Sequence, residues 1–128
     1  MQKFAFNKRE KLTKRKHIEE LFSNGTVINA FPYRILWELT TAQDSPIKFA
    51  ISVPKKKFKR AVDRNLLKRR AREAFRLHKA ELFNKLEDEN KTLNIFFIYV
   101  SHDILDFHTI EKKIVQIIQK VIAAVSTK

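Results

Sequence analysis

The sequence predicts an α+β fold, an α/β sandwich in which helices cover a single mixed sheet of about four strands. Its 128 residues are enough for one domain, and 44% of them are hydrophobic, which is a globular value. Stretches with strand-like alternation are interspersed with stretches of helical spacing. The predicted element order is αβββαβα. We expect a basic N-terminal arm at residues 1–10 and a single domain at residues 11–128.

The first half of the chain is predicted to hold one short helix and at least two strands. Residues 13–23 have apolar residues at helical spacing, and the Asn24-Gly25 pair that follows is typical of a helix end. Residues 31–40 alternate between two sides, and residues 47–53 do the same, so each stretch predicts a strand. A hairpin is the simplest connection between the two strands.

The second half is predicted to hold two long helices with a strand between them. Residues 60–82 form the longest helical pattern, and residues 87–91 have the composition of a charged linker. Residues 93–100 are nearly all apolar, as in a central strand that is covered on both faces. From residue 107 onward, apolar residues recur at helical spacing, which predicts a final helix.

The positive charge is concentrated in two segments. The chain has 27 Lys and Arg against 14 Asp and Glu, a net charge of +13. Residues 3–16 and 55–76 together hold 18 basic and three acidic residues, whereas the rest of the chain holds nine and eleven. Such clustering on a nearly neutral body indicates a shaped phosphate-binding surface, and a solvated face with mixed signs would not show it.

One face of the helix at residues 60–82 is almost purely cationic. Arginine pairs with phosphate oxygens, lysine adds point charges, and side chains one helical turn apart lie roughly 6 Å from one another, close to the phosphate spacing of a strand. An asparagine among them offers a donor and an acceptor suited to a base edge or a 2′-hydroxyl. This face comprises Asn65, Lys68, Arg69, Arg72 and Arg76, whereas Arg70 points toward the apolar arc.

Catalytic and metal-binding patterns are weak. The absence of cysteine excludes a disulfide partner, a thiolate zinc site and a cysteine nucleophile, and a single glycine excludes a Gly-rich phosphate loop. Ser101-His102-Asp103 has the residue types of a triad, but neighbours on an extended chain point apart. Residues 102–108 are more typical of a loop with helix-capping acids than of a metal site. These patterns predict a protein without catalytic or metal-binding residues. No apolar run is long enough for a membrane span and no signal segment is present, so we also predict that the protein is cytoplasmic.

Residues 53–76 resemble the signature of the bacterial ribonuclease P protein component. The RNR motif of that family matches at Arg64, Asn65, Lys68, Arg69, Arg72, Glu73 and Arg76, and a Lys-Lys pair that precedes it matches at Lys55 and Lys56. Residues 12–25 are similar to the first helix of the family and its terminating glycine, and the resemblance extends over roughly residues 10–125.

The resemblance implies the small protein subunit of a ribonucleoprotein that removes the 5′ leader from precursor tRNA. In that family the RNA subunit and its Mg²⁺ ions carry out the hydrolysis, so the protein binds no cofactor by itself and acts on RNA only as part of the holoenzyme. The implied partners are ribonuclease P RNA and precursor tRNA, and the implied fold has a left-handed strand–helix–strand crossover. The implied contacts to the RNA are made by Lys55, Lys56, Lys59, Arg60, Arg64, Asn65, Lys68, Arg69, Arg72 and Arg76.

The family also holds the single-stranded leader in a cleft between the first helix and the sheet. Two alternatives stay open for the strand at residues 31–40, because a slip of one residue exchanges its faces: Tyr33 with Trp37, or Arg34 with Leu36, would line the cleft. Tyr33 and Trp37 are equally compatible with a place in the core. The leader candidates are therefore Lys14, Ile18, Phe22, Tyr33, Arg34, Leu36 and Trp37.

Two other functions compete with this interpretation. A general RNA-binding or ribosomal-type module would show the same basic surface without any role in processing. A stand-alone nuclease would need a catalytic centre in the protein, and the residue patterns above do not favour one.

Overall fold

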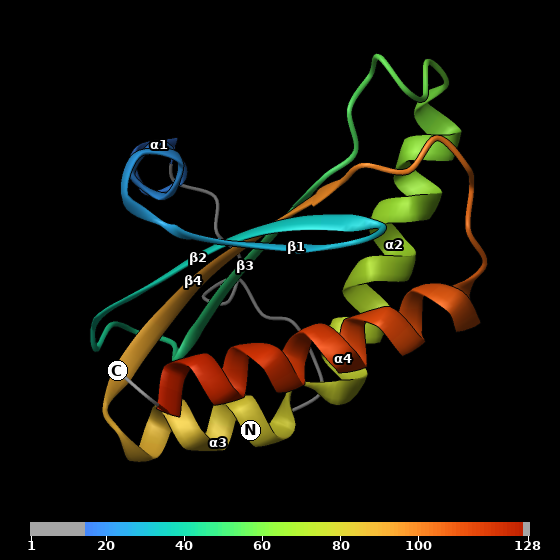
Figure 1. Ribbon diagram of the computed structural model, residues 1–128. Helices are drawn as coiled ribbons and strands as arrows, with labels where there is room; N and C mark the ends of the chain where they lie inside the picture. Colours follow the sequence, from blue (N-terminus) through green and yellow to red (C-terminus); the bar gives the residue numbers. More distant parts are fainter. Residues whose placement is uncertain (1–14, 127–128) are drawn as a thin grey trace.

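The structure, a computed structural model that describes residues 15–126, has helices packed on a four-stranded mixed sheet (Figure 1). The predicted N-terminal arm lies outside the described residues. The α+β sandwich is confirmed, with one helix more than predicted. The elements are α1 (Arg15–Asn24), β1 (Thr26–Ala30), β2 (Tyr33–Thr41), β3 (Ile47–Ser52), α2 (Ala61–His78), α3 (Ala80–Asp88), β4 (Lys91–Tyr99) and α4 (Phe107–Ser126).

The order of the strands in the sheet is β1-β2-β4-β3. β4 pairs antiparallel with β2 and parallel with β3, so it is a central strand, as its apolar composition predicted. The predicted hairpin between residues 31–40 and 47–53 is wrong because β4 lies between these two strands. The segment that connects them is bound by β4: the Leu93 N–H donates to the Pro46 oxygen at 2.8 Å, and the Thr92 hydroxyl donates to the Ser45 oxygen at 2.8 Å.

The helical pattern at residues 60–82 is divided between two helices. α2 ends at His78 and α3 begins at Ala80, and the buried Lys79 stands between them. The predicted linker at residues 87–91 is shorter than expected, because α3 continues to Asp88 and buries Leu82, Phe83 and Leu86 at helical spacing. A left-handed backbone at Asn90 (φ 55°) then leads the chain into β4.

The main core lies between one face of the sheet and the helices α2, α3 and α4. The rings of Phe49 in β3 and Phe75 in α2 stack with their centroids 4.6 Å apart, which fixes α2 on this face. α1 lies on the opposite face, where Leu21, Leu36 and Phe96 form a smaller cluster. Among residues 15–126, three helices therefore cover one face of the sheet and a single short helix lies on the other.

The loop before α4 has the helix-capping role that the sequence predicted. The Asp106 carboxylate accepts a hydrogen bond from the Thr109 N–H at 2.8 Å. Hydrogen bonding from the Thr109 side chain, and then from its backbone N–H, stabilises the charged form and lowers the pKa of Asp106. Within residues 15–126 no three His, Asp or Glu side chains are grouped as metal ligands would be. No helix in this part of the chain is both long and apolar enough to cross a membrane.

Candidate nucleic-acid interface

Residues 54–60, here called the cationic loop, connect β3 to α2. The loop holds five cations and no acidic residue. Its one aromatic side chain, Phe58, is buried and packs against Tyr99 with 5.8 Å between the ring centroids. The Pro54 oxygen accepts hydrogen bonds from the N–H groups of Lys57 and Phe58. The loop is thus anchored through a ring and its own backbone, and its exposed cations are Lys55, Lys56, Lys59 and Arg60.

Arg64 binds the cationic loop from the first turns of α2. Its Nη1 atom donates to the backbone oxygens of Phe58 and Lys59, each at 2.8 Å. These bonds satisfy two carbonyl groups in a loop that has no strand partner. Arg64, which the RNR motif suggests as an RNA contact, therefore has a second role, the positioning of the loop.

Lys57 holds the loop from the other side. Its Nζ atom donates to the Val100 oxygen at 2.8 Å and lies 3.4 Å from Nε2 of His102. Sequence reasoning did not select Lys57, because a lysine between other lysines gives no signal that distinguishes an intramolecular bond from a contact with phosphate.

The outward face of α2 keeps most of the predicted cations accessible. Asn65, Arg69 and Arg72 are exposed and Lys68 is half-buried. Arg76 forms an ion pair with Glu73, so part of its charge is neutralised within the helix. The structure also confirms that Arg70 points inward, since its Nη1 atom donates to the Leu105 oxygen.

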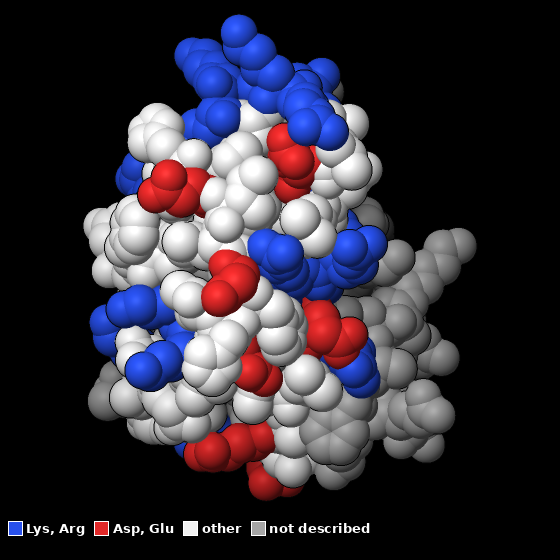
Figure 2. Space-filling view, turned by 90° about the vertical axis from the view of Figure 1, so that its right-hand side faces the viewer, with Lys and Arg blue, Asp and Glu red and all other residues white. Residues whose placement is uncertain are grey.

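The charge distribution follows these elements (Figure 2). Lys and Arg gather at the top of the view, over the cationic loop and the beginning of α2, and acidic side chains are more frequent in the lower half. Clustered cations on one part of the surface attract a polyanion and orient it as it approaches. We call the cationic loop together with Arg64, Asn65, Lys68, Arg69, Arg72 and Arg76 the basic surface.

The second predicted surface lies on the face of the sheet that α1 covers only in part, here called the open face. Phe22 in α1 is 58% exposed, and its ring meets the edge of Phe96 at a centroid distance of 5.7 Å. Arg34 is exposed on β2, and the neighbouring position on this face, Leu36, is 4% exposed within the small cluster.

The structure places the two alternative pairs of β2 on opposite faces of the sheet. Tyr33 and Trp37 are each 1% exposed and belong to the main core, so they do not line the open face. Burial also raises the pKa of the Tyr33 hydroxyl well above its usual value. Arg34 and Leu36 lie on the side of the strand that faces α1. Of the remaining leader candidates, Lys14 lies outside the described residues, and Ile18 lies in α1 with a side chain that is also outside them.

The basic surface and the open face meet at one end of the sheet. Ser52, the last residue of β3, is in register with Ile98, and Ile98 is in register with Arg34. The cationic loop leaves the sheet directly after this row. The open face and the cationic loop are therefore adjacent at this end of the sheet.

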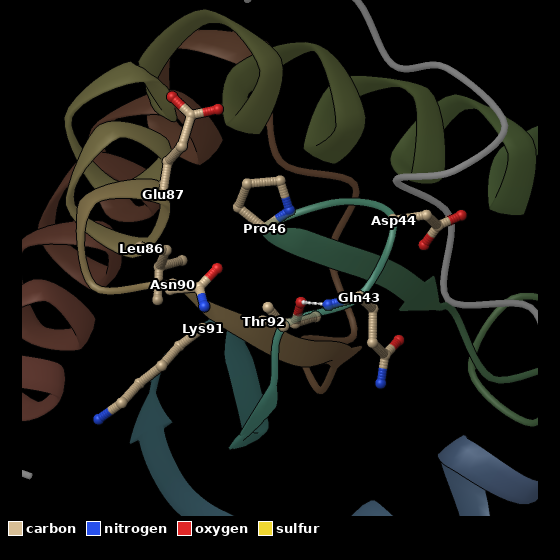
Figure 3. A pocket seen from close by; sticks show the side chains of 9 residues that line it. Gln43, Asp44, Pro46, Leu86, Glu87, Asn90, Lys91 and Thr92 are labelled. Atoms are coloured by element: carbon tan, nitrogen blue, oxygen red, sulfur yellow. Dashed lines mark hydrogen bonds between the residues drawn. The ribbon is translucent and has the colours of Figure 1, made fainter.

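Ser101, the first residue of the triad-like sequence, lies just after β4 and is bound by its own loop. It is buried, and its hydroxyl accepts a hydrogen bond from the Asp103 N–H at 3.0 Å. A pocket of about 200 Å³ lies at the opposite end, where β4 begins (Figure 3). Its Thr92 hydroxyl accepts from the Gln43 N–H and donates to the Ser45 oxygen, so it is engaged within the protein as both acceptor and donor.

Comparisons with known proteins agree on one family. A family model described as Ribonuclease P matches residues 6–122. The ribonuclease P protein component of Porphyromonas gingivalis is 36% identical over 110 residues, which cover 85% of this chain and 80% of that protein. The protein of the same name from Vibrio cholerae is 34% identical over 66% of this chain and 70% of that protein.

Solved structures support the same fold. The ribonuclease P protein from Thermotoga maritima superposes with a TM-score of 0.69 at 24% identity, over 88% of this chain and 97% of that one. A mutant of the Staphylococcus aureus protein gives a TM-score of 0.69 at 19% identity, over 91% and 90% of the two chains.

Proposed function

The chain belongs to the bacterial ribonuclease P protein component family, and from that premise we propose how its two surfaces divide the RNA between them. Ribonuclease P is the endoribonuclease that processes the 5′ end of precursor tRNA, and this chain is its protein subunit. In our proposal the basic surface binds the catalytic RNA, and the open face beside α1 binds the single-stranded leader of the precursor.

The observation that carries the first assignment is the accessibility of the basic surface. Seven of its ten predicted RNA contacts are exposed on two consecutive elements: Lys55, Lys56, Lys59, Arg60, Asn65, Arg69 and Arg72. Because the loop is anchored at Phe58, Lys57 and Arg64, little conformational entropy is lost when its cations bind phosphates.

The second assignment rests on the pairing of an exposed ring with an exposed cation. Phe22 offers a surface on which an unpaired base can stack, and Arg34 offers a charge for a neighbouring phosphate. We therefore assign the open face to the leader.

The protein does not supply the reactive groups in this proposal. As membership of the family implies, we assign the Mg²⁺ ions of the reaction to the RNA subunit. The protein positions the two RNAs and reduces the repulsion between them, and its +13 charge supports this role. We expect it to act in the cytoplasm.

Reconstitution tests the proposal. The full-length protein is mixed with a bacterial ribonuclease P RNA and a precursor tRNA at low Mg²⁺, where charge neutralisation matters most. We expect faster cleavage at the 5′ end with protein than without, and none by protein alone. Binding without faster cleavage would instead support a general RNA-binding module, and cleavage by the protein alone would place the catalytic centre in this chain.

A further inference from the structure

Phe31 is the most exposed large hydrophobic side chain of the described residues, at 63%. It lies in the turn between β1 and β2, after Ala30, whose register partner is Tyr33. The next residue, Pro32, is buried. The ring therefore lies at the tip of a short hairpin and belongs to neither hydrophobic cluster. Because it is mostly exposed, it contributes little to the stability of the fold.

The turn is tied to the cationic loop by two hydrogen bonds. The Val100 N–H donates to the Pro32 oxygen at 2.8 Å, and the Val100 oxygen accepts from Nζ of Lys57 at 2.8 Å. Val100 thus joins the residue after Phe31 to the middle of the loop. Since both bonds involve the backbone of Val100, the turn and the cationic loop are held to the same residue at the end of β4.

The charges around this turn are mostly positive. β1 has no charged residue, the nearest charged residue along the chain is Arg34, and the cationic loop has five cations and no acid. The carboxylates in the loop after β4 are Asp103 and Asp106, and Asp106 is engaged as the cap of α4. An exposed ring beside clustered cations is the arrangement with which proteins bind single-stranded RNA, where bases stack on aromatic rings and phosphates pair with the cations.

We propose that Phe31 is a stacking platform for an unpaired RNA base whose backbone phosphate is bound by the cationic loop. The site rests on the proposed function and extends it, because it places a base contact at the tip of the β1–β2 turn, outside both the basic surface and the open face. Stacking is tolerant of sequence, so the site accepts any base that is unpaired. That base belongs either to the catalytic RNA or to the precursor tRNA.

Substitutions at position 31 separate stacking from general hydrophobicity. Phe31→Ala and Phe31→Leu remove the ring, whereas Phe31→Tyr keeps it. Binding of each full-length variant is measured to a bacterial ribonuclease P RNA, and then binding of precursor tRNA to the assembled holoenzyme. We expect the Ala and Leu variants to weaken one of these two affinities by about 5- to 100-fold and the Tyr variant to stay near wild type.

The dependence on salt adds a second readout. A ring contact neutralises no phosphate, so the slope of log affinity against log salt is expected to stay unchanged in all three variants. Leu77→Ala, at an exposed apolar position near the end of α2, is the matched control and should bind both RNAs as wild type does. If binding to ribonuclease P RNA weakens, that RNA supplies the base. If binding of precursor tRNA to the holoenzyme weakens, the precursor supplies it.

A tryptophan at position 31 tests the contact directly. Trp37 is the only natural tryptophan and is buried in the core, so the emission of a Phe31→Trp variant reports mainly on the new indole. We expect its fluorescence to be quenched when the RNA binds. Three results would each overturn the inference. They are unchanged fluorescence of Phe31→Trp, wild-type affinity of Phe31→Ala for both RNAs, and wild-type affinity of Phe31→Leu for both RNAs.

The outcome for the wild-type protein separates this inference from the proposed function. If the wild type does not accelerate cleavage, both fail. If it does and the variants at position 31 match it, only the stacking site is wrong.

Discussion

The ammonium group of Lys57 donates a hydrogen bond to the backbone oxygen of Val100, 2.8 Å away. This bond joins the cationic loop to the end of the central strand, although the two residues are far apart in the sequence. Of three consecutive lysines, Lys57 therefore forms a bond within the protein, while Lys55 and Lys56 are exposed.

Lys57→Met is expected to loosen the cationic loop. The substitution keeps the length of the side chain but removes the bond to Val100, at a cost of about 1 kcal/mol. Hydrogen exchange at the amides of residues 57–59 should become faster in the free protein. Lys56→Met is the matched control, because it removes the same charge without the bond. If both variants exchange at the wild-type rate, Lys57 does not anchor the loop.

Arg64 and Arg72 are expected to differ, although both belong to the RNR motif. Arg72 is exposed, so Arg72→Ala should lower the salt slope of binding to the catalytic RNA by about 1 and change the free energy of unfolding by less than about 0.5 kcal/mol. Arg64→Ala should also weaken RNA binding. In addition it should lower the free energy of unfolding by about 1–3 kcal/mol, because two carbonyl groups lose their donor.

Urea unfolding and binding at several salt concentrations distinguish the two arginines. Equal stability of the two variants would contradict the positioning role of Arg64. Normal binding of both variants at every salt concentration would show that the basic surface is wrongly assigned.

Phe22→Ala is expected to reduce the preference for substrates that carry a leader. The ring is largely exposed and contacts only the edge of Phe96 among the described rings, so the fold should tolerate its loss. Loss of base stacking should weaken binding of precursor tRNA to the holoenzyme by about 1–3 kcal/mol and leave mature tRNA unaffected. The check is the ratio of the two affinities, and an equal loss for both RNAs would contradict a leader contact.

Tyr33→Phe is expected to leave RNA binding unchanged and to make the protein more stable. The Tyr33 hydroxyl is buried without a hydrogen-bond partner, so its removal should raise the free energy of unfolding by about 1 kcal/mol. Thermal or urea unfolding at neutral pH measures this gain. Weaker RNA binding by a stable Tyr33→Phe variant would contradict the place of this strand face in the core.

The same hydroxyl predicts a dependence on alkaline pH. Burial raises the pKa of Tyr33 above its ordinary value of 10.0, so the unfolded chain releases this proton at lower pH than the folded protein. This group therefore leaves the free energy of unfolding independent of pH well below pH 10, and lowers it as the pH rises above that value. Tyr33→Phe should show a smaller loss of stability than wild type between pH 9 and pH 11.

The sequence allowed prediction of those features that depend on local periodicity and charge. The cationic face of α2 followed from helical spacing alone, and the apolar run of β4 indicated a central strand. The break at Lys79 could not be predicted, because both helices continue the same apolar pattern and differ only in direction. The hairpin was predicted wrongly because β4, the strand that separates β2 from β3, occurs about forty residues later in the chain.

The sequence predicted which residue types make up the candidate site, but it did not predict the role of each side chain. Clustering of Arg and Lys located the basic surface, yet Arg64 and Lys57 bind backbone oxygens, which carry no signature in the sequence. For a related reason, the sequence did not show which face of β2 is buried in the core. Apolar or aromatic side chains occur on both sides of the strand, and only the packing of α2 and α4 shows that Tyr33 and Trp37 are covered.

The position of β4 between β2 and β3 also has a consequence for biosynthesis. While the ribosome has made only the first ninety residues, β2 and β3 have no strand between them and each lacks a neighbour on that side. A nascent or truncated chain of that length exposes unpaired strand edges, which favour aggregation and proteolysis. The sheet is completed only when the C-terminal third has been synthesised. Only then can Val100, at the end of β4, hold the cationic loop through Lys57.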